Sequence, residues 1–321
     1  MTALHTAPAP GWDPGWDTAL DRVRELVPYQ DQPAQLPAAS NGKVGVLRLG
    51  FARRGDRTIL AELYRQSPLL VQRALYWDEA MPQLPCVMIL TTSGGVLQGD
   101  RLRIDVDLGP GSQAHLVTQA ATKIQEMDAN FGSQSQRFTL ADDAYLEYLP
   151  EPTIPYRGSR FVTDTRVRLP PSATMLYAEV LQPGRKHYRE GELFAYDLYS
   201  STLRARRPDG RRLFTEKFVV APGRFGVQRV GMMDRFHLFG NVVLLTDPER
   251  AARVYARTAA PVWDERTPLA SAVSRLPNDA GLIFKVLGQE TEPVRAAVRA
   301  FCVAAREEVT GHTFPPPFSW R

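Results

Sequence analysis

The sequence is poor in the side chains that carry most catalytic and metal chemistry. Its 321 residues include only two cysteines, Cys86 and Cys302, and five histidines. Two cysteines this far apart in the chain give neither a disulfide framework nor a Cys-X-X-Cys metal motif. No histidine has another histidine or a cysteine two to four residues away, which disfavours a tetrahedral zinc site. We therefore predict no fixed metal site and expect both cysteines to be buried as small apolar residues.

Several other signatures are missing. No Gly-X-Ser-X-Gly nucleophile elbow occurs, and no Gly-X-Gly-X-X-Gly spacing is present. A phosphate-binding loop would need Gly-Lys-Ser/Thr before a helix, whereas Gly99 is followed by Asp100 and a predicted strand. No apolar run reaches 18 residues, and the N-terminus lacks the basic and apolar regions of a secretory signal. We therefore predict that the chain has no membrane-spanning segment and that the protein is cytoplasmic.

The overall charge is mild. The chain carries 39 basic and 35 acidic side chains, a net charge of +4, and 44% of its residues are hydrophobic. This predicts a folded protein with a substantial core and does not demand a nucleic-acid partner, although acidic protein partners remain open. One local basic cluster surrounds the Pro208-Asp209-Gly210 turn: Arg204, Arg206, Arg207, Arg211 and Arg212. A hairpin with solvated arginines explains this cluster more simply than a nucleic-acid site.

A glycine-rich corner and the strand that follows it organise the centre of the chain. The segment 91–100 reads Thr-Thr-Ser-Gly-Gly-Val-Leu-Gln-Gly-Asp, and its three glycines indicate a backbone that bends or approaches another group closely. Residues 101–108 then alternate strictly between polar and apolar side chains, which predicts a strand with one buried face. After a Gly-Pro-Gly turn, a second strand is expected from His115 to Ala121.

Most of the remaining chain also reads as strands, so we predict a mainly β fold with an antiparallel or coiled arrangement. Two short strands around a Gly-Asp turn form an expected hairpin in 44–70. Further strands are expected at 133–140, 144–149, 161–169, 174–181, 193–206, 211–220 and 237–245. Residues 1–40, rich in proline and alanine, are interpreted as a weakly ordered N-terminal extension to a body of residues 41–321.

The periodicity changes from strand to helix after residue 245, so the body divides into a mainly β part (41–245) and a helical C-terminal section (246–321). Asp247 and Pro248 form the N-cap and first turn of a helix that runs to Ala259. A second helix is predicted from Pro293 to Val309, with Gly311 as its end. Ala297 and Ala304 lie off its main apolar face and are interpreted as part of a second, partner-docking face.

The linked motifs of the central region resemble those of the urease accessory protein family UreD, also called UreH. The resemblance rests on Ser93–Leu102, Leu108–Gly111, Thr118–Lys123 and Leu146–Glu151 in this order, and it continues through Gly184-Arg185 and Gly191–Phe194 to Trp320. It covers about residues 43 to 321. The chain departs from the common family pattern at Thr92-Ser93, where Pro-Pro is usual, and at Pro317–Trp320, where Pro-Arg-X-Trp is usual.

The resemblance implies a maturation chaperone or scaffold that is not an enzyme. Members of this family bind the urease apoprotein and recruit a UreF-like protein and, through it, a UreG-like GTPase, so that nickel is inserted into the urease active site. A route for nickel through the UreD-like subunit has been proposed for the family. The resemblance thus implies protein partners but no nucleic acid or membrane, and no tightly bound cofactor, with nickel present only in transit.

The matched motifs also supply the candidate site residues, all with oxygen or amine side chains or with glycine. Oxygen ligands suit a transient nickel route because they hold nickel less tightly than imidazole or thiolate. The candidates for lining this path or supporting the motifs are Asp100, Thr118, Gln119, Lys123, Glu147 and Glu192, with the motif glycines Gly94, Gly95 and Gly99.

Two other classes of function remain open from the residues alone. A β-structured module that binds carbohydrate or another small ligand would present exposed aromatic platforms. A carboxylate-dependent hydrolase would need a pair of carboxyl groups in different environments, for which Asp100 and Glu147 are the candidates, although no spacing pairs them. An equally simple role for Asp100 is to accept hydrogen bonds from the backbone of the glycine corner.

Overall fold

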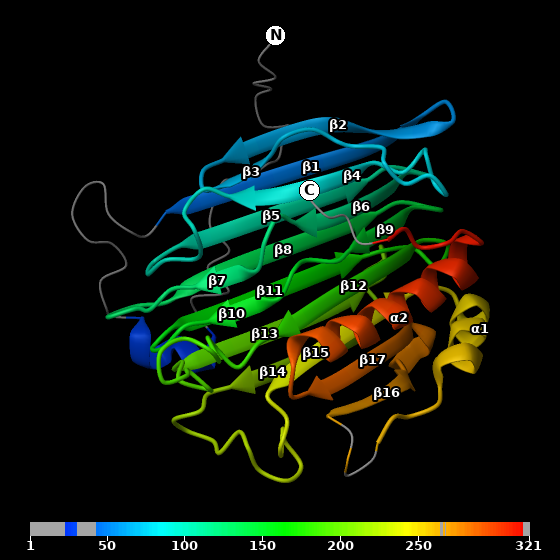
Figure 1. Cartoon of the computed structure of the whole chain (residues 1–321). Coiled ribbons are helices and arrows are strands. Elements are labelled where there is room, and N and C mark those ends of the chain that lie inside the picture. The colour runs from blue at the N-terminus through cyan, green and yellow to red at the C-terminus, as the bar shows by residue number, and fades with distance from the viewer. Residues whose placement is uncertain (1–22, 31–42, 264–265, 267, 317–321) are drawn as a thin grey trace.

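The computed structural model describes residues 23–30, 43–263, 266 and 268–316, and its core lies between two large stacked sheets (Figure 1). The seven-stranded sheet has the order β14 (Arg212–Val220), β13 (Leu198–Arg206), β11 (Arg160–Arg168), β8 (Gly132–Leu140), β5 (Arg101–Leu108), β1 (Val44–Arg54) and β2 (Arg57–Gln66). The ten-stranded sheet has the order β16 (Leu269–Arg275), β17 (Gly281–Gly288), β15 (Leu238–Leu245), β12 (Thr174–Leu181), β9 (Tyr145–Tyr148), β6 (Gln113–Thr118), β4 (Cys86–Thr91) and β3 (Leu69–Val71), with the short strands β7 (Thr122–Ile124) and β10 (Thr153–Pro155) beside it.

The chain coils between the two sheets in its central part. Strands β5, β8, β11 and β13 of one sheet alternate along the sequence with β6, β9 and β12 of the other, and neighbours within each sheet are parallel. Antiparallel pairs join the outer strands, such as β1 with β2 and β15 with β17. The mainly β fold is therefore confirmed, and of the two arrangements expected from the sequence, the coiled one describes the centre.

Several strand predictions agree with the structure residue by residue. Strands β5 and β12 have the expected bounds, and the hairpin of β1 and β2 turns at Gly55. In β5 the apolar residues Leu102, Ile104, Val106 and Leu108 are at most 5% exposed and enter the core between the sheets. The strand expected from residue 193 begins only at Leu198, because residues 193–197 form a loop.

The C-terminal section contains the two predicted helices. Helix α1 (Pro248–Thr258) begins as expected, because the side chain of Asp247 accepts hydrogen bonds from the backbone N–H groups of Glu249 and Arg250. Helix α2 (Thr291–Thr310) ends at Gly311, whose φ of 75° is left-handed. It lies across the outer face of β15 and β17, where Val294 and Phe301 are buried (Figure 1).

Two features of this section differ from the sequence-based expectation. Strands β16 and β17, with the short helix η2 (Pro277–Asp279) between them, extend the ten-stranded sheet, whereas only helices were expected here. Strand β17 is almost continuously apolar because α2 covers its outer face, so it lacks the alternation that identifies a half-buried strand. Ala304 is 5% exposed, so the interpretation of this residue as part of a partner-docking face is wrong.

The described part of the N-terminal extension packs against the body. Helix η1 (Arg24–Tyr29) places Leu26 in an apolar cluster with Phe131, Val162, Leu198 and Ala221 on the outer side of the seven-stranded sheet. The carboxylate of Glu25 pairs with Lys217. The remainder of residues 1–40, and Trp320 at the other end, lie outside the described residues.

The structure also bears on the predictions about membrane segments and about the two cysteines. Among the described residues, no helix has the length and apolar character needed to cross a membrane. Cys86 and Cys302 are free and buried, as expected for small apolar residues, and burial raises the pKa of the Cys86 thiol to about 11.

Candidate functional site

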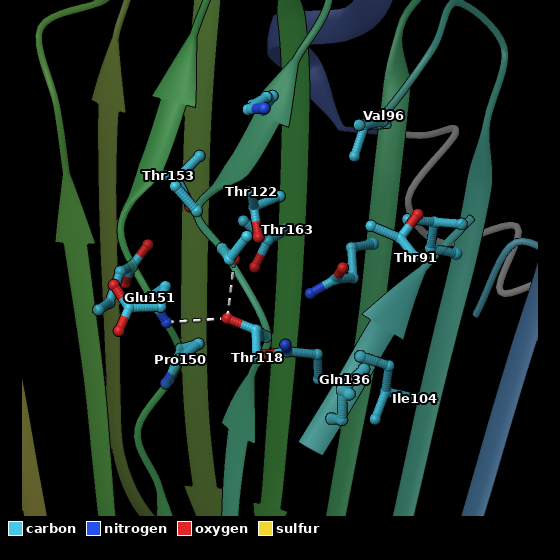
Figure 2. A pocket seen from close by; sticks show the side chains of 18 of the residues that line it. Thr91, Val96, Ile104, Thr118, Thr122, Gln136, Pro150, Glu151, Thr153 and Thr163 are labelled. Atoms are coloured by element: carbon cyan, nitrogen blue, oxygen red, sulfur yellow. Dashed lines mark hydrogen bonds between the residues drawn. The ribbon is translucent and has the colours of Figure 1, made fainter. Parts of the chain in front are cut away.

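A cavity of about 170 Å³ lies between the two sheets and is the candidate functional site. Strands β5, β8, β11 and β13 supply one wall, and β4, β6, β9 and β12 supply the other. Figure 2 shows side chains from both walls, with the hydroxyl groups of Thr118, Thr122 and Thr163 and the amide of Gln136 on the lining. This lining is unusual because the interior faces of stacked sheets are ordinarily apolar.

The glycine corner forms one end of this cavity. Val96 donates its N–H to the Lys123 carbonyl at 2.8 Å, and Gln125 donates to the Val96 carbonyl at 2.9 Å, which ties the corner to β7. Gly95 has a φ of +149°, and a Cβ there would lie only 2.5 Å from the Lys123 carbonyl oxygen. The corner therefore requires glycine at this position, since any side chain would break the contact with β7.

Three of the sequence-predicted side chains, together with two of the predicted glycines, line the cavity. They are Thr118, Gln119, Lys123, Gly94 and Gly95. Thr118, at the end of β6, accepts a hydrogen bond from the Glu151 N–H at 2.9 Å and donates one to the Ala120 carbonyl at 3.1 Å (Figure 2). These bonds hold the segment between β6 and β7 against the chain that follows β9.

The interior walls carry a hydrogen-bonded polar network that the sequence analysis missed. The Gln136 amide donates to the Tyr148 hydroxyl at 2.7 Å, and Thr165 donates to the Gln136 carbonyl at 2.8 Å. The Tyr177 hydroxyl lies 3.4 Å from that of Thr165. These bonds connect side chains from β8, β11, β9 and β12, so the network joins the two sheets across the cavity.

Glu179 is the acidic centre of this interior. It lies on β12, lines the cavity, and accepts hydrogen bonds from Tyr199 at 2.8 Å and from Ser201 at 3.2 Å, both on β13. Burial raises the pKa of Glu179 to about 7, and the two hydrogen bonds only partly oppose this effect. The carboxyl group thus changes its charge near neutral pH inside the cavity.

Asp100 lies outside the cavity and holds the glycine corner together. One of its carboxylate oxygens accepts from the Lys43 N–H and the other from the Leu97 N–H, both at 2.8 Å. The residue is fully buried. Its own N–H donates to the Leu97 carbonyl, and Gly99 before it has a φ of +76°. Asp100 thus fixes the turn from the corner into β5.

Glu147 belongs to a different buried group, on the ten-stranded sheet beneath α2. One oxygen lies 2.6 Å from Nδ1 of His115, and the other accepts from the Tyr145 hydroxyl at 2.5 Å and lies 3.6 Å from Nε of Arg306. Burial alone would raise the pKa of Glu147, but the hydrogen bond and charge of His115, with Arg306 and Tyr145, lower it. Arg306 also pairs with Asp78.

Glu192 lies in the loop between β12 and β13 and has hydrogen-bond partners of its own. Arg185 donates to its two oxygens at 2.7 and 2.6 Å. This bidentate hydrogen bond, together with the charge of Arg185, lowers the pKa of Glu192. Gly184 lets the chain close on itself here, since a Cβ at this position would lie 2.1 Å from the Glu192 carbonyl oxygen.

The structure thus brings Thr118, Gln119 and Lys123 together but places Asp100, Glu147 and Glu192 in three separate surroundings. Asp100 precedes a strand of the seven-stranded sheet, and Glu147 is part of the ten-stranded one. The sequence analysis missed Glu179. The sequence signal that could have identified it is that Glu179 is the only charged residue of β12, which reads Thr-Met-Leu-Tyr-Ala-Glu-Val-Leu. A carboxyl group at such a position needs a buried partner.

The donor set of the cavity suits weak metal coordination. It offers the carboxyl groups of Glu179 and Glu151, the amide oxygens of Gln119 and Gln136, and hydroxyl groups, which are hard oxygen donors. Within the described ranges, no cluster of three histidine, cysteine, aspartate or glutamate side chains has the geometry of a metal site. Among the described residues, the cavity therefore offers a cation carboxylate and neutral oxygen contacts and no preformed three-ligand site.

Comparison with known proteins gives a consistent result across the chain. The profile of the family described as "UreD urease accessory protein" matches residues 43–321. The "Urease accessory protein UreD 2" of Brucella suis is 56% identical over 301 residues, which cover 94% of this chain and 99% of the relative. The "Urease accessory protein UreD" of Photorhabdus laumondii is 50% identical over 297 residues, or 92% of each chain, and that of Yersinia pseudotuberculosis is 49% identical over the same length.

Proposed function

Since this chain belongs to the UreD family of urease accessory proteins, we propose that it is a non-enzymatic maturation chaperone that delivers nickel to urease through its interior cavity. In this function it binds the urease apoprotein in the cytoplasm. It also recruits the UreF-like accessory protein and, through that protein, the UreG-like GTPase. Nickel is the cargo of this assembly and is not a resident cofactor.

The observation that carries the nickel route is the polar cavity between the sheets, with Glu179 at its wall. Apolar side chains ordinarily fill the space between stacked sheets, because burial of a carboxyl group costs desolvation free energy and so lowers the stability of the fold. The cavity is bordered by the glycine corner, Thr118, Gln119 and Lys123, all of which lie in the segments on which the resemblance to the family rests. This coincidence of motif and cavity supports a transport function for the corner.

The oxygen donors of the cavity suit transient passage of nickel better than its storage. A cation in transit must be released, and oxygen donors bind nickel more weakly than imidazole or thiolate groups. Burial raises the pKa of Glu179 to about 7, so near neutral pH this group can take up a cation while releasing a proton. Proton uptake at the same oxygen then favours release of the cation.

The test is co-expression of the chain with the urease subunits, the UreF-like protein and the UreG-like GTPase, in the presence of nickel. We compare the wild-type chain with Glu179→Gln, which keeps the shape of the side chain but removes its charge. The control is Glu62→Gln, the same chemical change at a side chain that is 65% exposed on β2. A second variant, Ala121→Trp, narrows the cavity at a half-buried lining residue without changing charge.

Two quantities are measured in each preparation: the yield of the assembled complex and the nickel content per urease active site. Glu179→Gln and Ala121→Trp are expected to keep the yield of the complex and to lower the nickel content, while Glu62→Gln changes neither. Normal nickel content in both cavity variants would refute the route but leave the scaffold function. Failure of the wild-type chain to co-purify with any urease or accessory subunit would refute the scaffold function itself.

A further inference from the structure

A cationic hollow on the outer face of the seven-stranded sheet lies apart from the interior cavity. Strands β8, β11 and β13 and the turn after β13 line it, and the lining contains six arginines and one acid, Asp209. The arginines are Arg137, Arg166, Arg168, Arg204, Arg206 and Arg207. This hollow contains part of the basic cluster that the sequence shows around Pro208-Asp209-Gly210.

The arginines form rows because these strands are parallel and in register. Arg166 is paired with Arg137 on one side and with Arg204 on the other, and Arg168 is paired with Arg206. Neighbouring strands lie about 4.8 Å apart, so each row places like charges side by side, an arrangement that destabilises a sheet. The fold therefore keeps these positive charges together at some loss of its own stability.

Acidic side chains of the protein neutralise only part of this charge. Asp164 is shared between Arg166 and Arg204. Asp105, which neighbours Arg137 on β5, pairs with Arg103 at 2.8 Å. The Asp209 carboxylate accepts from the Arg211 N–H at the rim.

The arginines of the second row and of the adjoining loop have few acceptors. Arg168 donates to the Pro208 carbonyl, and Arg207 donates to the Leu169 carbonyl at 3.3 Å. Nε of the buried Arg207 has no hydrogen-bond partner in the described part of the chain. Arg206 is exposed and forms no ion pair with any of the described residues. The hollow thus presents guanidinium donors that an added anion could satisfy.

We propose that this hollow binds an extended acidic segment of a partner protein. Successive outward-facing residues of a strand are about 6.6 Å apart, and so are alternate side chains of an extended peptide. A segment with acidic residues at every second position would therefore match the spacing from Arg166 to Arg168 and from Arg204 to Arg206. Each guanidinium can hold a carboxylate through two parallel hydrogen bonds. This binding does not depend on the nickel route.

A protein segment fits the hollow better than a nucleic acid does. Single-stranded nucleic acids bind on exposed aromatic side chains, and the only aromatic residue of this lining, Phe138, is 1% exposed. Asp209 at the rim would also repel a continuous phosphate backbone, whereas a peptide can carry a neutral residue there. The net charge of the whole chain is only +4, so the basic character is local.

The test measures binding of a fluorescent peptide of alternating glutamate and serine, twelve residues long, to the purified full-length chain by anisotropy. The test variant is Arg168→Glu with Arg206→Glu, two exposed side chains whose replacement leaves the core unchanged. The control is Arg54→Glu with Arg73→Glu, which makes the same change in net charge at exposed positions outside the hollow. A neutral pair, Arg168→Gln with Arg206→Gln, serves as a milder variant.

We expect saturable peptide binding that weakens with added salt. The dissociation constant should rise at least about tenfold in the test variant, less in the neutral pair, and less than about twofold in the control. Equal weakening in test and control variants, or no saturable binding by the wild-type chain, would overturn the proposal. Tighter binding of a twelve-nucleotide single strand or of inorganic tripolyphosphate, lost in the same test variant, would assign the hollow to phosphates and also overturn it.

Discussion

The hydroxyl group of Tyr199 on β13 donates a 2.8 Å hydrogen bond to the carboxyl group of Glu179 on β12. These strands belong to different sheets, so this bond crosses the interior of the protein. Both groups are buried, with Tyr199 1% and Glu179 7% exposed. The hydrogen bond between Tyr199 and Glu179 thus joins the two walls of the cavity, and the Glu179 carboxyl group that accepts it can gain or lose a proton.

Stability should depend on pH through Glu179. Burial raises its pKa from 4.5 to about 7 in the folded protein, so the folded state favours the protonated carboxyl. The resulting stabilisation is complete below about pH 4.5 and disappears as the pH rises through 7. Relative to Glu179→Gln, the wild-type chain should lose up to about 3 kcal/mol of unfolding free energy between pH 5 and pH 8. Urea denaturation of both proteins at the two pH values measures this difference, and a constant difference would contradict it.

Asp100→Asn should destabilise the glycine corner. Both carboxylate oxygens accept backbone N–H groups, from Lys43 and Leu97, whereas an asparagine must direct its own NH₂ group at one of these donors. We expect a loss of about 1–3 kcal/mol of unfolding free energy. The control is Asp56→Asn, at an exposed position in the turn of the β1–β2 hairpin. Equal unfolding free energies of the two variants would show that Asp100 does not hold the corner.

Glu147→Gln should destabilise the packing of α2 on the ten-stranded sheet. Glu147 and Arg306 are both fully buried, so loss of the carboxylate leaves the guanidinium with Asp78 alone. Because Arg306 keeps Asp78, we expect a loss of roughly 1–3 kcal/mol of unfolding free energy. Glu151→Gln is a matched control, because Glu151 pairs with Arg295 of the same helix at a partly exposed position, where an ion pair contributes about 0–1 kcal/mol. Thermal unfolding of both variants compares them directly.

Leu26→Ala should destabilise the body although Leu26 belongs to the N-terminal extension. Its side chain is 0% exposed in a cluster with Phe131 and Leu198, and removal of a buried leucine side chain costs about 2–5 kcal/mol. Val27→Ala is the control, since Val27 is 61% exposed. Chemical denaturation of the two variants gives the difference. An unchanged midpoint for Leu26→Ala would support the interpretation of residues 1–40 as an extension without a structural function.

The sequence predicted those features that depend on neighbouring residues. The alternation of residues 101–108 gave the bounds of β5, and the pair Asp247-Pro248 gave the start of α1, because strand period and helix capping are local properties. The glycine corner was identified from composition, and its cause is a close backbone contact at Gly95. The mainly β fold followed from many such segments taken together.

The partners of the candidate residues were decided only by the tertiary structure. Alternation of polar and apolar residues along a strand shows that the strand has a buried face and an exposed face, but it does not show which side chains of the other sheet lie opposite. In β12 even the two faces cannot be distinguished, because all eight residues are buried. The coiling of the chain between two sheets brings Glu179 to Tyr199 and places Asp100, Glu147 and Glu192 in separate surroundings. The same coiling sets Arg137, Arg166 and Arg204 side by side, since parallel pairing in register joins strands that are far apart in sequence.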